Sequence, residues 1–131
     1  MLDLVLRNGW LIDPERLTMQ PGSVGVKEGR IAAIYGIGAK LPEAERTVDL
    51  GGLAVSPGFI DVHAHLDGHM ESGRRALLQG ITTSFGGNCG LSPIDMEAFF
   101  NSQAEGFCVN QAEFVGHSFS LREEVGLKDA Y

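Results

Sequence analysis

Residues 57–65 read Pro-Gly-Phe-Ile-Asp-Val-His-Ala-His, and the fold predicted for the chain follows from them. The apolar run from Phe59 to Val62 predicts a strand that is buried on both faces, as in a parallel sheet. His63 and His65 follow this run at a spacing of two, which on an extended backbone turns both imidazoles to the same face. Two neutral imidazoles on one face can bind a divalent metal ion. We therefore predict a metal site here, although a lone histidine in a folded domain is more often simply packed or solvated.

The rest of the second half alternates between strand-like and helix-like segments. We predict strands over 81–85 and 112–115, and helices over 70–78, 95–103 and 121–125. This alternation indicates an α/β fold of parallel βα units joined by right-handed crossovers. In such folds the carboxyl ends of the strands form the active face. His63 and His65 follow the first strand, Cys89 follows the second and His117 the third, so we expect these side chains at one edge of the sheet.

Residues 1–56 have a different pattern, in which short strands are separated by turn sequences. Strands are predicted over 4–6, 10–12, 23–27, 30–35 and 47–50. Asn8-Gly9 is a strong hairpin signal between the first two, and Glu28-Gly29 predicts another turn. We expect a small antiparallel sheet without catalytic residues, which ends at a boundary around residues 53–57.

Cys89 lies in the sequence Gly-Gly-Asn-Cys-Gly, whose glycines allow positive φ angles and a close approach of the backbone. A thiolate is a strong zinc ligand, and its pKa falls when it binds a metal. The alternative is a small buried residue in a tight turn. Cys108 has apolar neighbours in the sequence and is predicted to be a core thiol, whereas His69 is predicted to lie on the surface.

Other polar residues near these positions are candidates for substrate contacts or for orienting the ligands. His117 can serve as a ligand, as a substrate contact or as a hydrogen-bond partner of a ligand. Asp67 follows His65 by two and can orient a histidine or line the pocket, but a helix N-cap explains it equally well. Asn88, next to Cys89, is a further candidate.

Composition excludes several classes of function. The chain has 131 residues, 44% of them hydrophobic, and a net charge of −7, which argues against nucleic-acid binding. It contains no apolar run long enough to span a membrane and begins without a signal-peptide pattern, so we expect a cytoplasmic protein. The phosphate-binding glycine motifs and the Gly-x-Ser-x-Gly elbow of serine hydrolases are both missing.

The segment Gly51–His65 preceded by a small sheet resembles the metal-dependent amidohydrolase superfamily. Gly80-Ile81-Thr82-Thr83 and the later Gly-Asn-Cys-Gly at 87–90 resemble most the N-acyl-D-amino-acid deacylases, also called D-aminoacylases. The Val-Gly-His sequence at 115–117 is similar to the third-strand region of that group. The resemblance extends from Asp3 to about Gly126.

The resemblance implies a (β/α)₈ TIM barrel flanked by a small β-sandwich, and hydrolysis of the amide bond of N-acyl-D-amino acids. It implies that His63, His65 and Cys89 bind one or two zinc ions, with the cysteine in place of the carboxylated lysine of other members. It also implies a small-molecule N-acyl amino acid as the substrate. A carboxylate from a late barrel strand would be the general base.

The length of the chain departs from this family, because a full barrel needs roughly 250 residues. We therefore expect residues 1–56 to be part of the β-sandwich and residues 57–131 to be about three βα units of an incomplete barrel, with the base beyond residue 131. Such a fragment would be inactive alone. Two alternatives stay open: a cyclic-amide hydrolase of the dihydroorotase or hydantoinase type, and a non-catalytic chain. The latter would associate with itself or with a complementing chain through exposed sheet edges.

Overall fold

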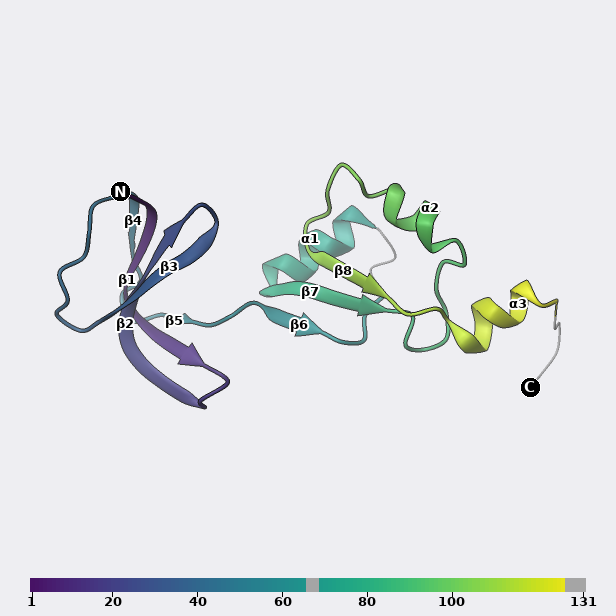
Figure 1. The fold of residues 1–131 in the computed structure, drawn as a ribbon. Coiled ribbons are helices and arrows are strands. Elements are labelled where there is room, and N and C mark those ends of the chain that lie inside the picture. Colours follow the sequence, from purple (N-terminus) through teal and green to yellow (C-terminus); the bar gives the residue numbers. More distant parts are fainter. Residues whose placement is uncertain (66–68, 127–131) are drawn as a thin grey trace. The chain divides into compact units, whose positions relative to one another are not determined.

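The computed structural model of the chain describes residues 1–65 and 69–126. It divides into two compact units, Met1–Pro57 and Gly58–Tyr131, which are described separately (Figure 1). The first unit consists of strands and the second alternates strands with helices. The helices among the described residues are all too short or too polar to cross a membrane.

The N-terminal unit is a five-stranded mixed sheet. Its strands are β1 (Leu2–Asp13), β2 (Thr18–Lys27), β3 (Arg30–Gly36), β4 (Ala44–Asp49) and β5 (Ala54–Val55). They lie in the order β3-β2-β1-β4, and β5 also pairs with β1. The β1–β2 and β2–β3 pairs are antiparallel, but β4 and β5 run parallel to β1. The predicted all-antiparallel sheet is therefore wrong, because the loop after β3 carries the chain across to the far side of β1.

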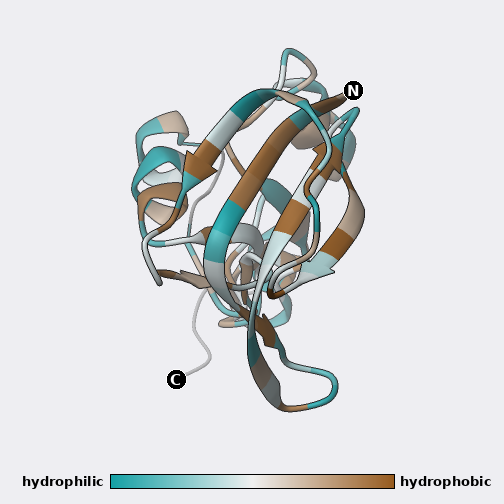
Figure 2. Cartoon of the chain, turned by 90° about the vertical axis from the view of Figure 1, so that its left-hand side faces the viewer, coloured by the Kyte–Doolittle hydropathy of each residue, from teal (hydrophilic) through white to brown (hydrophobic). Residues whose placement is uncertain are grey.

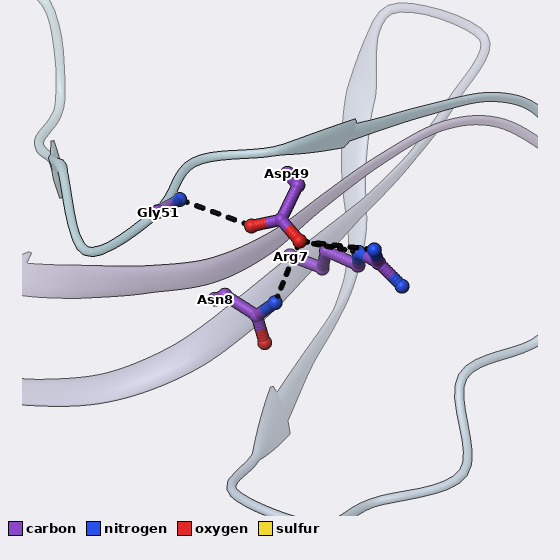
Figure 3. Close-up of polar contacts among 4 residues, drawn as sticks. All are labelled: Arg7, Asn8, Asp49 and Gly51. Atoms are coloured by element: carbon purple, nitrogen blue, oxygen red, sulfur yellow. Dashed lines mark hydrogen bonds and ion pairs between the residues drawn. The ribbon is translucent and has the colours of Figure 1, made fainter.

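The hairpin predicted at Asn8-Gly9 is also wrong, because β1 continues through both residues. Asn8 has a φ of 59°, and the pairing of β1 with β2 shifts register between Leu6 and Gly9, so this sequence forms a β-bulge. The Asn8 side chain donates to Asp49 Oδ2 at 3.0 Å (Figure 3). A positive φ at Asn-Gly is common to bulges and hairpin turns, so the local sequence cannot distinguish them.

The turn predicted at Glu28-Gly29 is confirmed. Both residues have positive φ, 51° and 69°, and the flanking Lys27 and Arg30 pair across β2 and β3. Val5, Leu11 and Val24 are the buried hydrophobic residues of this unit. Figure 2 shows hydrophobic and hydrophilic positions alternating along its strands, as expected for a sheet with one covered face.

The second unit contains a three-stranded parallel sheet in the order β6-β7-β8. The strands are β6 (Phe59–Asp61), β7 (Ile81–Gly86) and β8 (Asn110–Glu113). The helices are α1 (Met70–Leu78), α2 (Met96–Asn101), the π-helix η1 (His117–Leu121) and α3 (Arg122–Glu124). The predicted alternation of parallel strands and helices is confirmed, with boundaries that move by a few residues, but the π-helix η1 was not predicted.

Helix α1 packs against the segment that leads into β8. Gly73 and Ala76 are its buried residues, and a Cβ at Gly73 would lie 2.7 Å from the ring of Phe107. Val109, in the same segment before β8, is also buried, with 6% of its surface exposed. A larger residue at position 73 would therefore force the ring of Phe107 to move.

The expectation that residues 59–62 are buried on both faces is wrong for this chain. Phe59, Ile60 and Val62 are each about 60% exposed. The reason is that β6 is an edge strand, which pairs with β7 alone among the described strands. An apolar edge strand is a site where another strand can add to a sheet.

Candidate metal centre

The histidine pair lies just beyond the end of β6 and is fixed there by backbone hydrogen bonds. The N–H of His63 donates to Asp61 Oδ1 at 3.2 Å, so this carboxylate closes a turn at the strand end. The N–H of Ala64, between the two histidines, donates to the carbonyl of Phe85 in β7 at 2.8 Å. These bonds hold the His-x-His segment beside the neighbouring strand, and the two imidazole rings lie 5.9 Å apart between centroids.

Cys89 lies in a tight turn that directly follows β7. The N–H of Gly90 donates to the carbonyl of Gly87 at 3.0 Å and closes the turn. Gly87 has a φ of +80°, and a Cβ there would collide with the carbonyl oxygen of Phe114. Glycine is therefore needed at position 87 for both its conformation and its lack of a side chain.

The two strand ends bring His63, His65 and Cys89 together. One ligand atom from each of these exposed residues lies within 4.8 Å of the others. The closest approach is between Cys89 Sγ and His65 Nε2, at 3.2 Å. Zinc bonds of about 2.3 Å to sulfur and about 2.0 Å to nitrogen would put two tetrahedral ligands about 3.5 Å apart. The donor types and their spacing fit a zinc ion after small side-chain rotations.

A pocket of about 390 Å³ adjoins Cys89, between the loops that follow β7 and β8. Its lining residues are Gly87, Asn88, Cys89, Gly90, Phe114, Val115, His117 and Ser118. His117 therefore shares a pocket with Cys89 but is not part of the His63–His65–Cys89 cluster. Phe114 and Val115 are exposed apolar residues. The pocket thus combines an imidazole and an amide with an apolar wall.

The other sequence candidates have different positions. Asp67 lies outside the described residues. His69 is exposed at the N-cap of α1 and makes no side-chain cap bond. Cys108 is half-buried, and its sulfur lies 3.1 Å from Met70 Sδ.

Sequence reasoning missed a pair of serines that join the two loops. Ser92 follows the Cys89 turn, and Ser120 lies in η1 with 3% of its surface exposed. The N–H of Ser92 donates to Ser120 Oγ at 2.7 Å. Serine in a loop carries no sequence signal of such a contact, because the pairing depends on β7 and β8 being neighbours.

Residues 46–119 match the amidohydrolase family, and the chain belongs to that family. This assignment agrees with the parallel βα order and with ligand-type side chains at successive strand ends. The match begins in the last N-terminal strands and includes the whole His63–His65–Cys89 cluster.

Within this family the chain is similar to enzymes that deacylate D-amino acids. It is 35% identical to N-acyl-D-glutamate deacylase of Alcaligenes xylosoxydans xylosoxydans, over 89% of the chain and 29% of that protein. It is 41% identical to D-aminoacylase of the same organism, over 69% of the chain and 19% of that protein. The chain thus spans less than a third of the length of these relatives.

A solved structure of a relative supports the fold. N-acyl-D-glutamate deacylase from Bordetella bronchiseptica matches with a TM-score of 0.78 and 35% identity, over 92% of this chain and 30% of that one. That structure is a complex with zinc and a phosphonate inhibitor that mimics the tetrahedral intermediate. The described residues therefore have an α/β fold with a mixed and a parallel sheet, similar to that of the deacylases.

Proposed function

We propose that this chain supplies the first part of the zinc centre of an enzyme that hydrolyses the amide bond of N-acyl-D-amino acids. His63, His65 and Cys89 would be the metal ligands. The observation that carries the proposal is the approach of two imidazoles and a thiol to within 4.8 Å from consecutive strand ends. The names of the similar proteins support the substrate class.

The donor set suits zinc among the common divalent ions. Imidazole and thiolate are preferred by zinc, whereas magnesium and calcium prefer oxygen ligands. A bound zinc ion lowers the pKa of water to about 7 and polarises a carbonyl group. In this chain the Asp61 and Phe85 hydrogen bonds would hold the histidines ready, so little ordering would be needed when the ion binds.

The pocket beside Cys89 would receive part of the substrate. Its imidazole and amide, from His117 and Asn88, can form hydrogen bonds to a polar group, while Phe114 and Val115 offer an apolar surface. An N-acyl amino acid has both kinds of group next to the scissile amide. We propose that His117 and Asn88 contact substrate rather than the metal.

We propose that the chain by itself has no turnover. Within residues 1–65 and 69–126, the cluster of potential ligands contains no carboxylate that could act as general base. In the complete enzyme such a carboxylate would take a proton from water and pass it to the leaving amine. Residues 1–56 would then be part of a small β-sandwich, and residues 57–131 the first units of a barrel.

A second proposal concerns association, and it is favoured by the exposed edge strand β6. Phe59, Ile60 and Val62 lie on or next to this edge and are mostly exposed. A further strand, from a second copy or a complementing chain, would cover them. Light scattering tests this, since a stable monomer at high concentration would contradict it.

A chimera tests the deacylase proposal. Residues 1–126 would replace the matching segment of the Alcaligenes D-aminoacylase, and the product would be assayed on N-acyl-D-amino acids and on cyclic amides such as a dihydropyrimidine. We expect zinc-dependent release of the free D-amino acid, which the Cys89→Ser version should lose. A folded, zinc-loaded chimera that acts only on the cyclic amide would favour the alternative.

A further inference from the structure

We propose that Ser120, with Ser92, is a positioning residue that holds Cys89 in place for the metal cluster. This inference rests on the proposed metal binding. It concerns hydroxyl groups in two loops that follow different strands, and neither serine is a candidate ligand itself.

Ser120 bonds to the backbone of Ser92 in both directions. Its Oγ accepts from the N–H of Ser92 at 2.7 Å and donates to the carbonyl of Ser92 at 2.6 Å. The hydroxyl of Ser92 in turn accepts from the N–H of Gly116 at 2.8 Å. One side chain from each loop thus satisfies backbone groups of the other.

A second set of bonds joins η1 to the residue directly after Cys89. The carbonyl of Gly90 accepts from the N–H groups of Phe119 at 2.9 Å and Ser120 at 3.2 Å. Gly90 has a φ of +90°, and a Cβ there would lie 2.7 Å from Cβ of Ser118. The Cys89 turn is therefore in direct contact with the first residues of the π-helix. Such helices occur frequently at functional sites.

Burial makes the serine pair difficult to replace. Ser120 is only 3% exposed, so water would not readily replace its hydroxyl if the hydroxyl were removed. The N–H and carbonyl of the half-buried Ser92 would then lose their partner, and leaving polar groups without a hydrogen bond there costs stability. The loop would rearrange to satisfy them, and it carries Cys89 only three positions earlier.

The consequence for the cluster is geometric. The sulfur of Cys89 lies 3.2 Å from His65 Nε2, and a displacement of about 1 Å is enough to spoil a preorganised site. Groups bonded directly to metal ligands typically contribute about 10- to 100-fold to metal affinity, and Ser120 acts one step further out, through Ser92 and Gly90. Ser120 should therefore affect metal binding without touching the metal.

The test uses the full chain and Co²⁺, whose thiolate complexes absorb in the near ultraviolet. We expect Ser120→Ala to weaken Co²⁺ binding about 10-fold or more and to reduce the thiolate band, with Ser120→Thr restoring both. The matched control is Ser102→Ala, because the exposed hydroxyl of Ser102 donates to Phe99 within its own helix at 2.6 Å. The control should bind Co²⁺ like the unmodified chain.

A metal-free measurement separates this inference from the proposed function. In a Cys108→Ser background, the reaction rate of Cys89 with a disulfide reagent at fixed pH should change at least about threefold in Ser120→Ala, because the turn loosens. Failure of the unmodified chain to bind Co²⁺ would contradict the proposed function, and the thiol rate would then decide the role of Ser120.

Circular dichroism checks that each variant is folded. A folded Ser120→Ala variant with unchanged Co²⁺ affinity, band and thiol rate would overturn the inference. If Ser120→Ala does not fold, Ser92→Ala decides, because it removes the bond from the N–H of Gly116 and the bond to the carbonyl of Pro93 but leaves the Ser120 hydroxyl in place. Unchanged Co²⁺ affinity and an unchanged thiol rate in that variant would likewise overturn it.

Discussion

The sulfur of Cys89 lies 3.2 Å from Nε2 of His65, although the two residues are 24 positions apart in the sequence. The contact exists because β6 and β7 are parallel neighbours, so the residues that follow them meet at one edge of the sheet. His63 completes the cluster from the same loop as His65. This relationship leads directly to predictions about metal binding.

Replacement of Cys89 by serine should remove most of the zinc affinity of the chain. A hydroxyl keeps the size of the side chain but is a far weaker zinc ligand than a thiolate. We expect a loss of about 10-fold or more, since even indirect partners of a metal contribute that much. Zinc content after gel filtration measures it, with Cys108→Ser as the control because Cys108 contacts Met70 instead. Equal loss in both variants would remove Cys89 from the proposed ligands.

Replacement of His65 by asparagine should have a similar effect on zinc, whereas the same change at His69 should have none. Asparagine keeps a polar side chain but provides no imidazole nitrogen. His69 is exposed at the start of α1 and makes no cap bond with its side chain. Isothermal titration with zinc compares the two variants. An unchanged His65→Asn titration would mean that the imidazole contact with Cys89 is only a hydrogen bond.

The sequence predicts that Cys89 and the histidine pair follow strands, because strand ends can be recognised from apolar runs and glycines. The structure brings these three side chains together, and their role as metal ligands stays a prediction. The contacts between the loops could not be predicted, since Ser92 and Ser120 have no distinguishing pattern. Their pairing depends on which strands are neighbours, which is a property of the tertiary fold.

In the N-terminal unit too, short sequence patterns were not enough to predict contacts that depend on the tertiary fold. Glu28-Gly29 was correctly predicted as a turn, but Asn8-Gly9 forms a bulge inside β1. What decides between the two outcomes is distant in sequence. The Asn8 side chain donates to Asp49 (Figure 3), and the Asn8 carbonyl accepts from the N–H of Gly52 at 2.8 Å. Asp49 ends β4 and Gly52 follows it, and the parallel pairing of β4 with β1 that brings both residues to Asn8 could not be predicted from turn residues.

Replacement of Gly87 by alanine should destabilise the second unit by about 1–3 kcal/mol, the cost of a non-glycine residue held in a strained conformation. The residue has a φ of +80°, and the new methyl group would collide with the backbone of Phe114. Chemical denaturation followed by circular dichroism measures the change. The control is Gly36→Ala, where nothing lies within 4 Å of the added carbon. Equal stability of the two variants would contradict the close approach of the loops.

Acid should destabilise the N-terminal unit as three partly or fully exposed aspartates are protonated. The N–H of Gly51 and the side chains of Asn8 and Arg7 hold the pKa of Asp49 below its usual 3.8. Hydrogen bonds from Arg16 lower the pKa of Asp13, and one from the Lys27 ammonium lowers that of Asp3. A depressed carboxyl pKa contributes stability that is fully present above the unfolded value and is lost as the pH falls through the folded value.

The contribution of Lys27 to stability depends on pH in the opposite direction. Its hydrogen bond to Asp3 raises its pKa above 10.5, so this contribution is present below that pH and is lost at more alkaline pH. The melting temperature of the N-terminal unit should therefore be flat near neutrality and should fall at both extremes. Fluorescence of Trp10, the single tryptophan of the chain, follows this unit.

The Asp49→Asn variant isolates one of these contributions. Asparagine has a single acceptor oxygen, so it can keep the bond from Gly51 or the bond from Asn8 but not both, since these go to different oxygens of Asp49. It also loses the ion pair with Arg7, whose Nη2 lies 2.9 Å from Asp49 Oδ2. The variant should melt lower than the parent near neutral pH, and the difference should shrink as the pH falls through the lowered pKa of Asp49, where the parent aspartate also loses its charge. Glu43→Gln removes an exposed carboxylate just before β4 and serves as the control.

If Asp49→Asn melts like the parent at every pH, the Asp49 cluster does not stabilise the bulge of β1 against β4. If Glu43→Gln shows the same pH-dependent difference, the effect comes from net charge rather than from the hydrogen bonds of Asp49.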